Sequence, residues 1–218
     1  MSNPAGIVVV VHGGREVGLR PVLAVDLPVL RMIPVAWEIE RAVGGSGIEV
    51  WRHRFAVIGW NGDQASPVGD LNRLLDGIGA DVRYDGVPVL VAGHSMGARA
   101  AVRAAGHPVV CAVAVLAPWL PAGEPVGQLS GRRLLLAHGS ADTITDPGET
   151  WAYAGRAREV TSVTALEIRG GDHAMLRRAD LWHAIAAEFA RVAFGLPAGP
   201  GPAAAAVRNS KDDDITLV

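Results

Sequence analysis

Three side chains of the sequence have the types that nucleophilic catalysis requires, and each follows an apolar run. Ser95 lies at the centre of Gly93-His94-Ser95-Met96-Gly97, whereas Asp142 and His173 lie in two later loops. A serine hydroxyl is a weak nucleophile near neutral pH, so it needs a base within reach, and imidazole suits that role. A carboxylate holds the imidazole in one tautomer and stabilises its protonated form. These residues therefore predict nucleophilic catalysis at Ser95.

The surroundings of Ser95 make its short motif informative. The apolar run 87–92 before it predicts a strand buried on both faces, and the alanines after it predict a helix. A turn this tight strains the backbone of Ser95, exposes its hydroxyl and leaves no room for side chains at Gly93 and Gly97. The amide of Met96 then lies at a helix N-terminus, where an anion is favoured. The alternative is a capping serine in a glycine-rich turn.

Two aspartates compete for the role of the acid. Asp142 comes soon after the predicted strand 133–138, whereas Asp146 precedes Pro147 and is well placed to cap a helix. We prefer Asp142 and keep Asp146 as the alternative. Asp172 is adjacent to His173 in sequence, which makes a bond between their side chains awkward. We expect Asp172 to shape the loop instead.

His173 has one rival as the base. His183 falls in the predicted helix 180–194, where we expect it to pack or to face solvent. Three further histidines lie beside glycines at strand ends, and we expect them to brace loops: His12, His94 and His138.

Strands and helices alternate along the chain, which predicts an α/β protein with a doubly wound parallel sheet in a three-layer sandwich. Six strands are expected, at 7–11, 48–58, 87–92, 109–116, 133–138 and 163–168. Pro21 and Pro28 break the stretch before residue 34, so we expect the first regular helix to begin at Pro34. Ligands of such sheets bind at the carboxyl ends of the strands. We assign residues 1–196 to one domain and predict that 197–218 are a disordered tail.

Composition limits the class of partner. The chain has 218 residues, a net charge of −2 and no basic stripe, which argues against a nucleic-acid partner. No apolar run is long enough to span a membrane. Cys111 is the single cysteine and no secretory leader is visible, so we expect a cytoplasmic protein. Oligomeric state is left open.

No pattern in the sequence indicates a cofactor. Paired cysteines, His-x-x-x-His and acidic clusters with ligand spacing do not occur, so no metal is expected. The glycine pattern of dinucleotide-binding proteins does not occur either.

Four stretches together resemble signatures of the α/β-hydrolase superfamily: His12-Gly13-Gly14, Gly93 to Gly97, His138 to Asp142, and Gly171-Asp172-His173. The order of Ser, Asp and His is that of the family's triad. The chain is most similar to compact serine esterases and to dienelactone-hydrolase-like or acyl-peptidase-like members. The resemblance spans about residues 7–194 and implies Ser95 as nucleophile, His173 as base and Asp142 as acid. It also implies an oxyanion hole formed by the amides of Gly14 and Met96.

The chain departs from the common family pattern at two places. No room exists before residue 7 for the family's first two strands, and residues 117–131 are too short and proline-rich for a cap domain. We therefore expect an open, shallow site. Trp119 is the first candidate for a pocket wall, followed by Ile144, Trp60 and Met96. Arg15 can bind a substrate carboxylate, the alternative being a solvated loop arginine.

These features predict a serine hydrolase that acts on a carboxylic ester or thioester of a small molecule through an acyl-enzyme. Two alternatives stay open. One is a ligand-binding receptor on the same fold, and the other is a lyase or cyclase that uses the same pocket.

Overall fold

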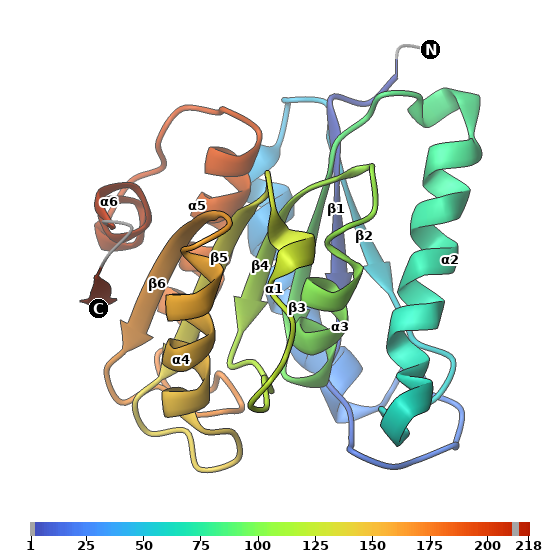
Figure 1. Ribbon diagram of the computed structural model, residues 1–218. Coiled ribbons are helices and arrows are strands. Elements are labelled where there is room, and N and C mark those ends of the chain that lie inside the picture. Colours follow the sequence, from blue (N-terminus) through green and yellow to red (C-terminus); the bar gives the residue numbers. More distant parts are fainter. Residues whose placement is uncertain (1–2, 211–213) are drawn as a thin grey trace.

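A seven-stranded, fully parallel sheet forms the centre of the computed structural model, which describes residues 3–210 and 214–218 (Figure 1). The strand order is β2-β1-β3-β4-β5-β6-β7. The strands are β1 (Gly6–Val11), β2 (Ile48–His53), β3 (Val89–His94), β4 (Val110–Leu116), β5 (Arg133–Gly139), β6 (Ser162–Ile168) and β7 (Ile215–Leu217). The predicted doubly wound α/β sandwich is confirmed, although the second strand ends at His53 and not at residue 58.

Helices cover both faces of the sheet, with α2, α3 and α4 in front and α1 and α5 behind in Figure 1. The helices are α1 (Leu27–Val43), α2 (Ser66–Ala80), α3 (Met96–Ala104), α4 (Pro147–Ala157), α5 (Ala179–Ala193) and α6 (Pro202–Asn209). Short 3₁₀ turns occur at η1 (Gly62–Gln64), η2 (Val82–Tyr84) and η3 (Gly127–Leu129). Among the described residues, no helix is long and apolar enough to cross a membrane.

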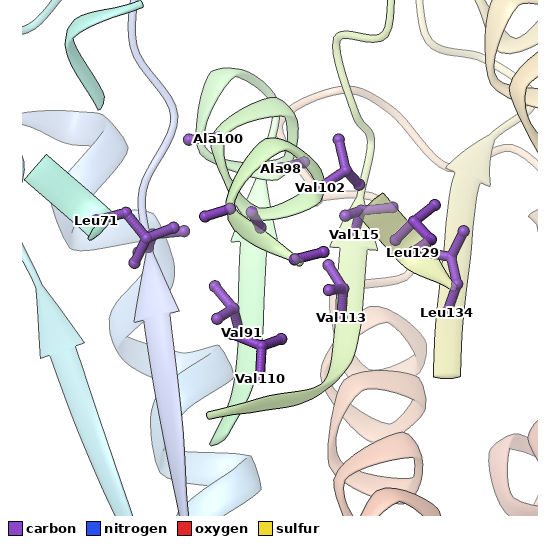
Figure 2. Packing of buried hydrophobic residues seen from close by; sticks show 14 of the residues in the cluster. Leu71, Val91, Ala98, Ala100, Val102, Val110, Val113, Val115, Leu129 and Leu134 are labelled. Atoms are coloured by element: carbon purple, nitrogen blue, oxygen red, sulfur yellow. The ribbon is translucent and has the colours of Figure 1, made fainter. Parts of the chain in front are cut away.

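The central strands fill two hydrophobic cores at once, because successive side chains of a strand point to opposite faces. In β1, Val9 and Val11 pack on the side of α2 and α3, whereas Val8 and Val10 pack on the side of α1 and α5. All six residues of β1 are buried. Figure 2 shows the first of these cores, in which small residues of α3 lie close to the valines of β3 and β4. This explains why the central strands have continuous apolar sequences.

The order of the strands creates a crevice at one edge of the sheet. The chain passes from β1 to β2 on one side of β1 and then crosses back to β3 on its other side. Loops that leave the carboxyl ends of β1 and β3 therefore diverge, and ligands of such sheets bind in the opening between them. Gly14 and Ser95 follow these two strands. Between β4 and β5, the described residues form only the short turn η3, so no cap domain covers this edge.

Helix α1 begins seven residues earlier than the sequence suggested. It begins at Leu27 with Pro28 in its first turn, where a missing amide hydrogen costs nothing. Pro34 lies inside the helix and removes one backbone bond. Apolar side chains at helical spacing, including Met32, Val35 and Ile39, are buried against the sheet. Burial of these side chains offsets the lost backbone hydrogen bond. The helix therefore continues through Pro34, and the start predicted from the prolines is wrong.

The prediction of a disordered tail at 197–218 is wrong for the described part of that segment, whereas residues 211–213 lie outside the described residues. Helix α6 buries Ala203, Ala204 and Val207 against its neighbours, chiefly α5. The buried carboxylate of Glu188 on α5 accepts hydrogen bonds from the amide of Gly199 and from Arg208. Strand β7 then pairs with β6 and makes the seventh strand, where six were expected.

Removal of residues 197–218 tests the contribution of this segment to stability. A chain that ends at Leu196 loses the burial of one valine and two alanines, so its free energy of unfolding should fall by about 2–4 kcal/mol. Urea unfolding monitored by circular dichroism measures the change. A chain that ends at Ser210 retains α6 and should lose less. Equal stability of all three chains would show that the segment contributes nothing.

Candidate active site

The turn between β3 and α3 strains Ser95 and raises its side chain above the sheet. Its backbone has φ 53° and ψ −117°, a conformation that a residue with a side chain rarely adopts. A Cβ on Gly93 would meet the backbone of Gly97 and Ala98, and a Cβ on Gly97 would meet the carbonyl of His12. The two glycines are therefore required by space, as the sequence motif predicted.

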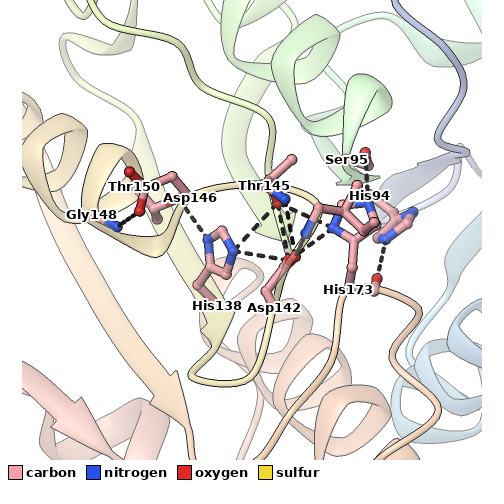
Figure 3. A network of polar contacts seen from close by, with 10 residues as sticks. His94, Ser95, His138, Asp142, Thr145, Asp146, Gly148, Thr150 and His173 are labelled. Atoms are coloured by element: carbon pink, nitrogen blue, oxygen red, sulfur yellow. Dashed lines mark hydrogen bonds and ion pairs between the residues drawn. The ribbon is translucent and has the colours of Figure 1, made fainter.

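His173 joins the loop after β6 to Ser95 (Figure 3). Its Nε2 lies 3.0 Å from Ser95 Oγ, and its Nδ1 lies 2.8 Å from Asp142 Oδ2. These contacts require one tautomer, in which Nδ1–H donates to the carboxylate and Nε2 accepts from the serine hydroxyl. Three side chains from separate loops thus meet at one edge of the sheet.

Asp142 is the most heavily hydrogen-bonded side chain of the site. Its side chain is completely buried. Oδ1 accepts from the amides of Ile144 (2.8 Å) and Thr145 (3.0 Å). Oδ2 accepts from His173 Nδ1, from His138 Nε2 (3.0 Å) and from the hydroxyl of Thr145 (3.0 Å). Burial by itself would raise the pKa of Asp142, but these bonds outweigh it and hold the pKa well below its usual range. The carboxylate is therefore ionised at neutral pH.

The other acidic and basic candidates lie elsewhere. Asp146 caps α4, where its Oδ1 accepts from the amide of Gly148 at 2.7 Å. Asp172 accepts from two amides of its own loop at 2.9 Å and so shapes it, as expected. His183 lies in α5 and lines a different, apolar groove. The structure brings Asp142, and neither Asp146 nor Asp172, to the imidazole of His173.

Two histidines brace the loops of the site, as the sequence suggested. His94 is buried, and its Nε2–H donates to the carbonyl of His173 at 2.8 Å. Burial and the neighbouring His173 lower the pKa of His94 to about 3, so this ring is neutral at pH 7. His12 donates from Nδ1 to the carbonyl of Gly13 and accepts at Nε2 from the amide of Phe55.

The role of His138 goes beyond the loop support that its position indicated. Its buried ring donates from Nε2 to Asp142 and accepts at Nδ1 from the hydroxyl of Thr150 at 2.7 Å. Thr145 was not singled out from the sequence, yet its Oγ1 lies 3.1 Å from His173 Nδ1. The only signal for it was its position three residues after Asp142, where an aspartate commonly accepts local backbone amides.

A hollow of about 250 Å³ opens beside Ser95. All of the predicted pocket residues except Trp60 line this hollow, and Glu16 lines it as well. The lining residues are Gly14, Arg15, Glu16, Ser95, Met96, Trp119, Ile144 and Thr145. Trp60 is buried behind Trp119. In the described part of the chain, the amides of Gly14 and Met96 donate to no acceptor, so both are free to bind an oxygen in the hollow.

These groups have the chemistry required for acyl transfer. A hydroxyl contacts the acceptor nitrogen of an imidazole, an ionised carboxylate holds that imidazole, and the two residues whose amides have no acceptor line the same hollow as the hydroxyl. Within residues 3–210 and 214–218, no group of three or more His, Cys, Asp or Glu side chains is arranged to hold a metal ion.

Neither a protein-family model nor a curated protein matches the sequence. Solved structures do match its fold. A lidless α/β serine hydrolase from Xanthomonas campestris is 21% identical, with a TM-score of 0.57 over 91% of this chain and 86% of that one. An esterase from Pyrococcus furiosus is 16% identical, with a TM-score of 0.66 over 87% and 81%. Est1E from Butyrivibrio proteoclasticus, solved with ferulic acid bound, is 14% identical, with a TM-score of 0.62 over 88% and 90%.

These proteins share little sequence with the chain, but their architecture extends over most of its length. The matches extend over 87% to 91% of this chain, and the Xanthomonas campestris neighbour lacks a lid. The fold implied by the four sequence signatures is thereby confirmed: this chain has the α/β-hydrolase fold, in a form without a cap domain.

Proposed function

We propose that this protein is a serine hydrolase that cleaves carboxylic ester or thioester bonds of small, accessible substrates. One observation carries the proposal: the imidazole of His173 contacts Ser95 Oγ at 3.0 Å and the carboxylate of Asp142 at 2.8 Å. A nucleophile, its base and the group that orients the base are thus in hydrogen-bond contact before any substrate binds.

The reaction follows from these contacts. His173 Nε2 takes the proton of Ser95 as its Oγ attacks the substrate carbonyl. The resulting imidazolium is stabilised by Asp142 and then gives the proton to the departing alcohol or thiol. Water, activated by the same imidazole, attacks the acyl-enzyme and releases the acid, which restores Ser95. Atoms and protons balance without a cofactor.

The negative charge on the carbonyl oxygen needs donors that are already in position. We assign this role to the amides of Gly14 and Met96, since both residues line the hollow and neither amide has another acceptor among the described residues; Met96 also begins α3, whose N-terminus favours an anion. Loss of one such donor in other enzymes costs about 3–4 kcal/mol in the barrier.

The fold neighbours support an ester as substrate. The Pyrococcus furiosus neighbour is an esterase, and Est1E was solved with ferulic acid bound. The hollow beside Ser95 is small and lies at an edge that no cap covers, which favours small or exposed acyl groups. We extend the proposal to a small-molecule substrate and a cytoplasmic location, as expected from the sequence.

Substitutions of Ser95 and Asp142 test the triad, and a substitution of Asp146 serves as the control. Ser95→Ala and Asp142→Asn should lower kcat/KM for a short-chain aryl ester by about 10⁴-fold or more, because each removes a member of the unit. Asp146→Asn, which alters only the helix cap, should retain activity within about twofold. Steady-state hydrolysis and mass spectrometry of a fluorophosphonate adduct provide the measurements.

The adduct also separates the alternatives. Labelling at Ser95 with turnover that Ser95→Ala abolishes supports the hydrolase. Labelling without turnover of any ester favours a receptor, lyase or cyclase on the same fold. A larger loss for Asp146→Asn than for Asp142→Asn would reverse our assignment of the acid.

His138 provides a second test, because it supplies one of the donors to Asp142. His138→Leu removes this bond to a buried charge, so kcat/KM should fall about tenfold to a hundredfold. The lost donor also moves the pKa of Asp142 upward, but four donors remain and the carboxylate stays ionised at neutral pH, so the loss in kcat/KM should be the same across the neutral pH range. His138→Gln keeps an N–H donor and should recover part of the loss. The pH profile of kcat/KM measures both effects.

His107 offers a matched control for that experiment. Its Nε2 pairs with Asp76 at 3.1 Å, a histidine–aspartate contact outside the site. His107→Leu should leave both the rate and the pH profile as in wild type. A value of kcat/KM in His138→Leu equal to that of wild type at every pH would mean that His138 only fills space.

A further inference from the structure

The guanidinium of Arg99 lies in the corner formed by two tryptophan rings beside the candidate active site. Its Cζ is 4.0 Å from the ring centroid of Trp60 and 4.5 Å from that of Trp119. The two rings meet edge to face, with centroids 5.9 Å apart. Of these three residues, only Trp119 lines the hollow next to Ser95. Arg99 thus contacts the wall of the hollow from behind.

A buried carboxylate fixes the position of this guanidinium. Arg99 Nε donates to Glu124 Oε2 at 2.7 Å, and the other carboxylate oxygen accepts from Arg103. The side chain of Glu124 is 1% exposed and that of Arg99 is 13% exposed. The guanidinium therefore donates to a buried carboxylate and also contacts two indoles that are nearly perpendicular to each other, which restricts its movement.

The backbone links this cluster to the nucleophile. The carbonyl of Ser95 accepts from the amide of Arg99 at 3.2 Å and from the amide of Trp119 at 3.3 Å. Arg99 is one helical turn after Ser95 on α3, and Trp119 follows β4. The carbonyl of Ser95 thus ties the strained turn to the backbone of Trp119, and this fixes the position of Trp119 relative to Ser95.

We propose that Arg99 is a positioning residue that holds the indole of Trp119 as a rigid wall, and that this wall limits the enzyme to short acyl chains. The proposal rests on the proposed function of the same site. Trp119 is the largest side chain that lines the hollow of about 250 Å³. An indole held by packing alone could rotate away to admit a longer acyl chain. The indole of Trp119 contacts the fixed guanidinium of Arg99 and cannot rotate without loss of that cation–π contact.

Arg103 supplies a matched control. Arg99 and Arg103 each donate to Glu124, but only Arg99 contacts the tryptophans. Arg99→Met should raise the ratio of kcat/KM for p-nitrophenyl octanoate over acetate about tenfold, which is within the range for a small change in an apolar pocket. Arg103→Met should leave the ratio within twofold of wild type. An equal rise in both variants would overturn the proposal.

A double variant tests whether Arg99 acts through Trp119. Trp119→Ala should raise the same ratio, and addition of Arg99→Met to it should cause no further rise. A further rise of the same size in the Trp119→Ala background would overturn the proposal. Arg99→Lys, which keeps the positive charge but not the planar guanidinium, should give an intermediate ratio. This variant serves as the test if Arg99→Met does not fold.

Near-ultraviolet circular dichroism separates this proposal from the proposed function. The signal of the Trp60–Trp119 pair is the difference between wild type and Trp119→Phe. Arg99→Met should lose most of this signal and Arg103→Met should retain it. If wild type hydrolyses no ester, the proposed function fails, and this measurement alone decides whether Arg99 holds Trp119. A full signal in Arg99→Met would overturn the positioning role.

Discussion

Burial of one ionised carboxylate is the constraint on which the rest of the site depends. A charge removed from water is costly unless donors surround it, and Asp142 has five. To supply them, the loop after β5 must fold back on its own side chain, and the loop after β6 must bring His173 to the same point. The position of the imidazole over Ser95 is a consequence of this arrangement. The carboxylate therefore organises two loops as well as one tautomer.

Strain at Ser95 is the second constraint, and the surrounding structure supports it. The amide of Ser95 donates to the carbonyl of Leu116 at 3.1 Å, and its carbonyl accepts from two amides. Such contacts can maintain an unfavourable backbone conformation that would cost of order 1–3 kcal/mol if unsupported. The neutral ring of His94 acts in the same way on the other partner, because it holds the carbonyl of His173. Both halves of the Ser95–His173 contact are thus held through their backbones.

Local sequence patterns predicted the buried strands and the two glycines around Ser95, because each of these features depends mainly on residues that are neighbours in the sequence. The central strands and the meeting of Ser95, Asp142 and His173 were predictable because parallel strands align their carboxyl ends at one edge. The start of α1 was not, because burial of Met32 and Val35 outweighs the effect of Pro34. The last helix was missed because its apolar face consists of alanines and one valine, which gain stability only from a partner. The bonds of Arg99 to Glu124 and of His138 to Thr150 were not predictable, because they link residues that lie far apart in the sequence.

Strand β7 has a consequence for the behaviour of the molecule at high concentration. An edge strand presents unpaired amides and carbonyls, which can recruit a strand from another molecule and begin aggregation. Residues 215–217 occupy that position on β6, and the backbone of Val218 pairs with Glu167 and Arg169. The new edge is only three residues long and partly exposed. Proteolytic loss of these few residues would uncover Ala165, Leu166 and Glu167 of β6 and so lengthen the open edge of that strand as a template for intermolecular sheet growth.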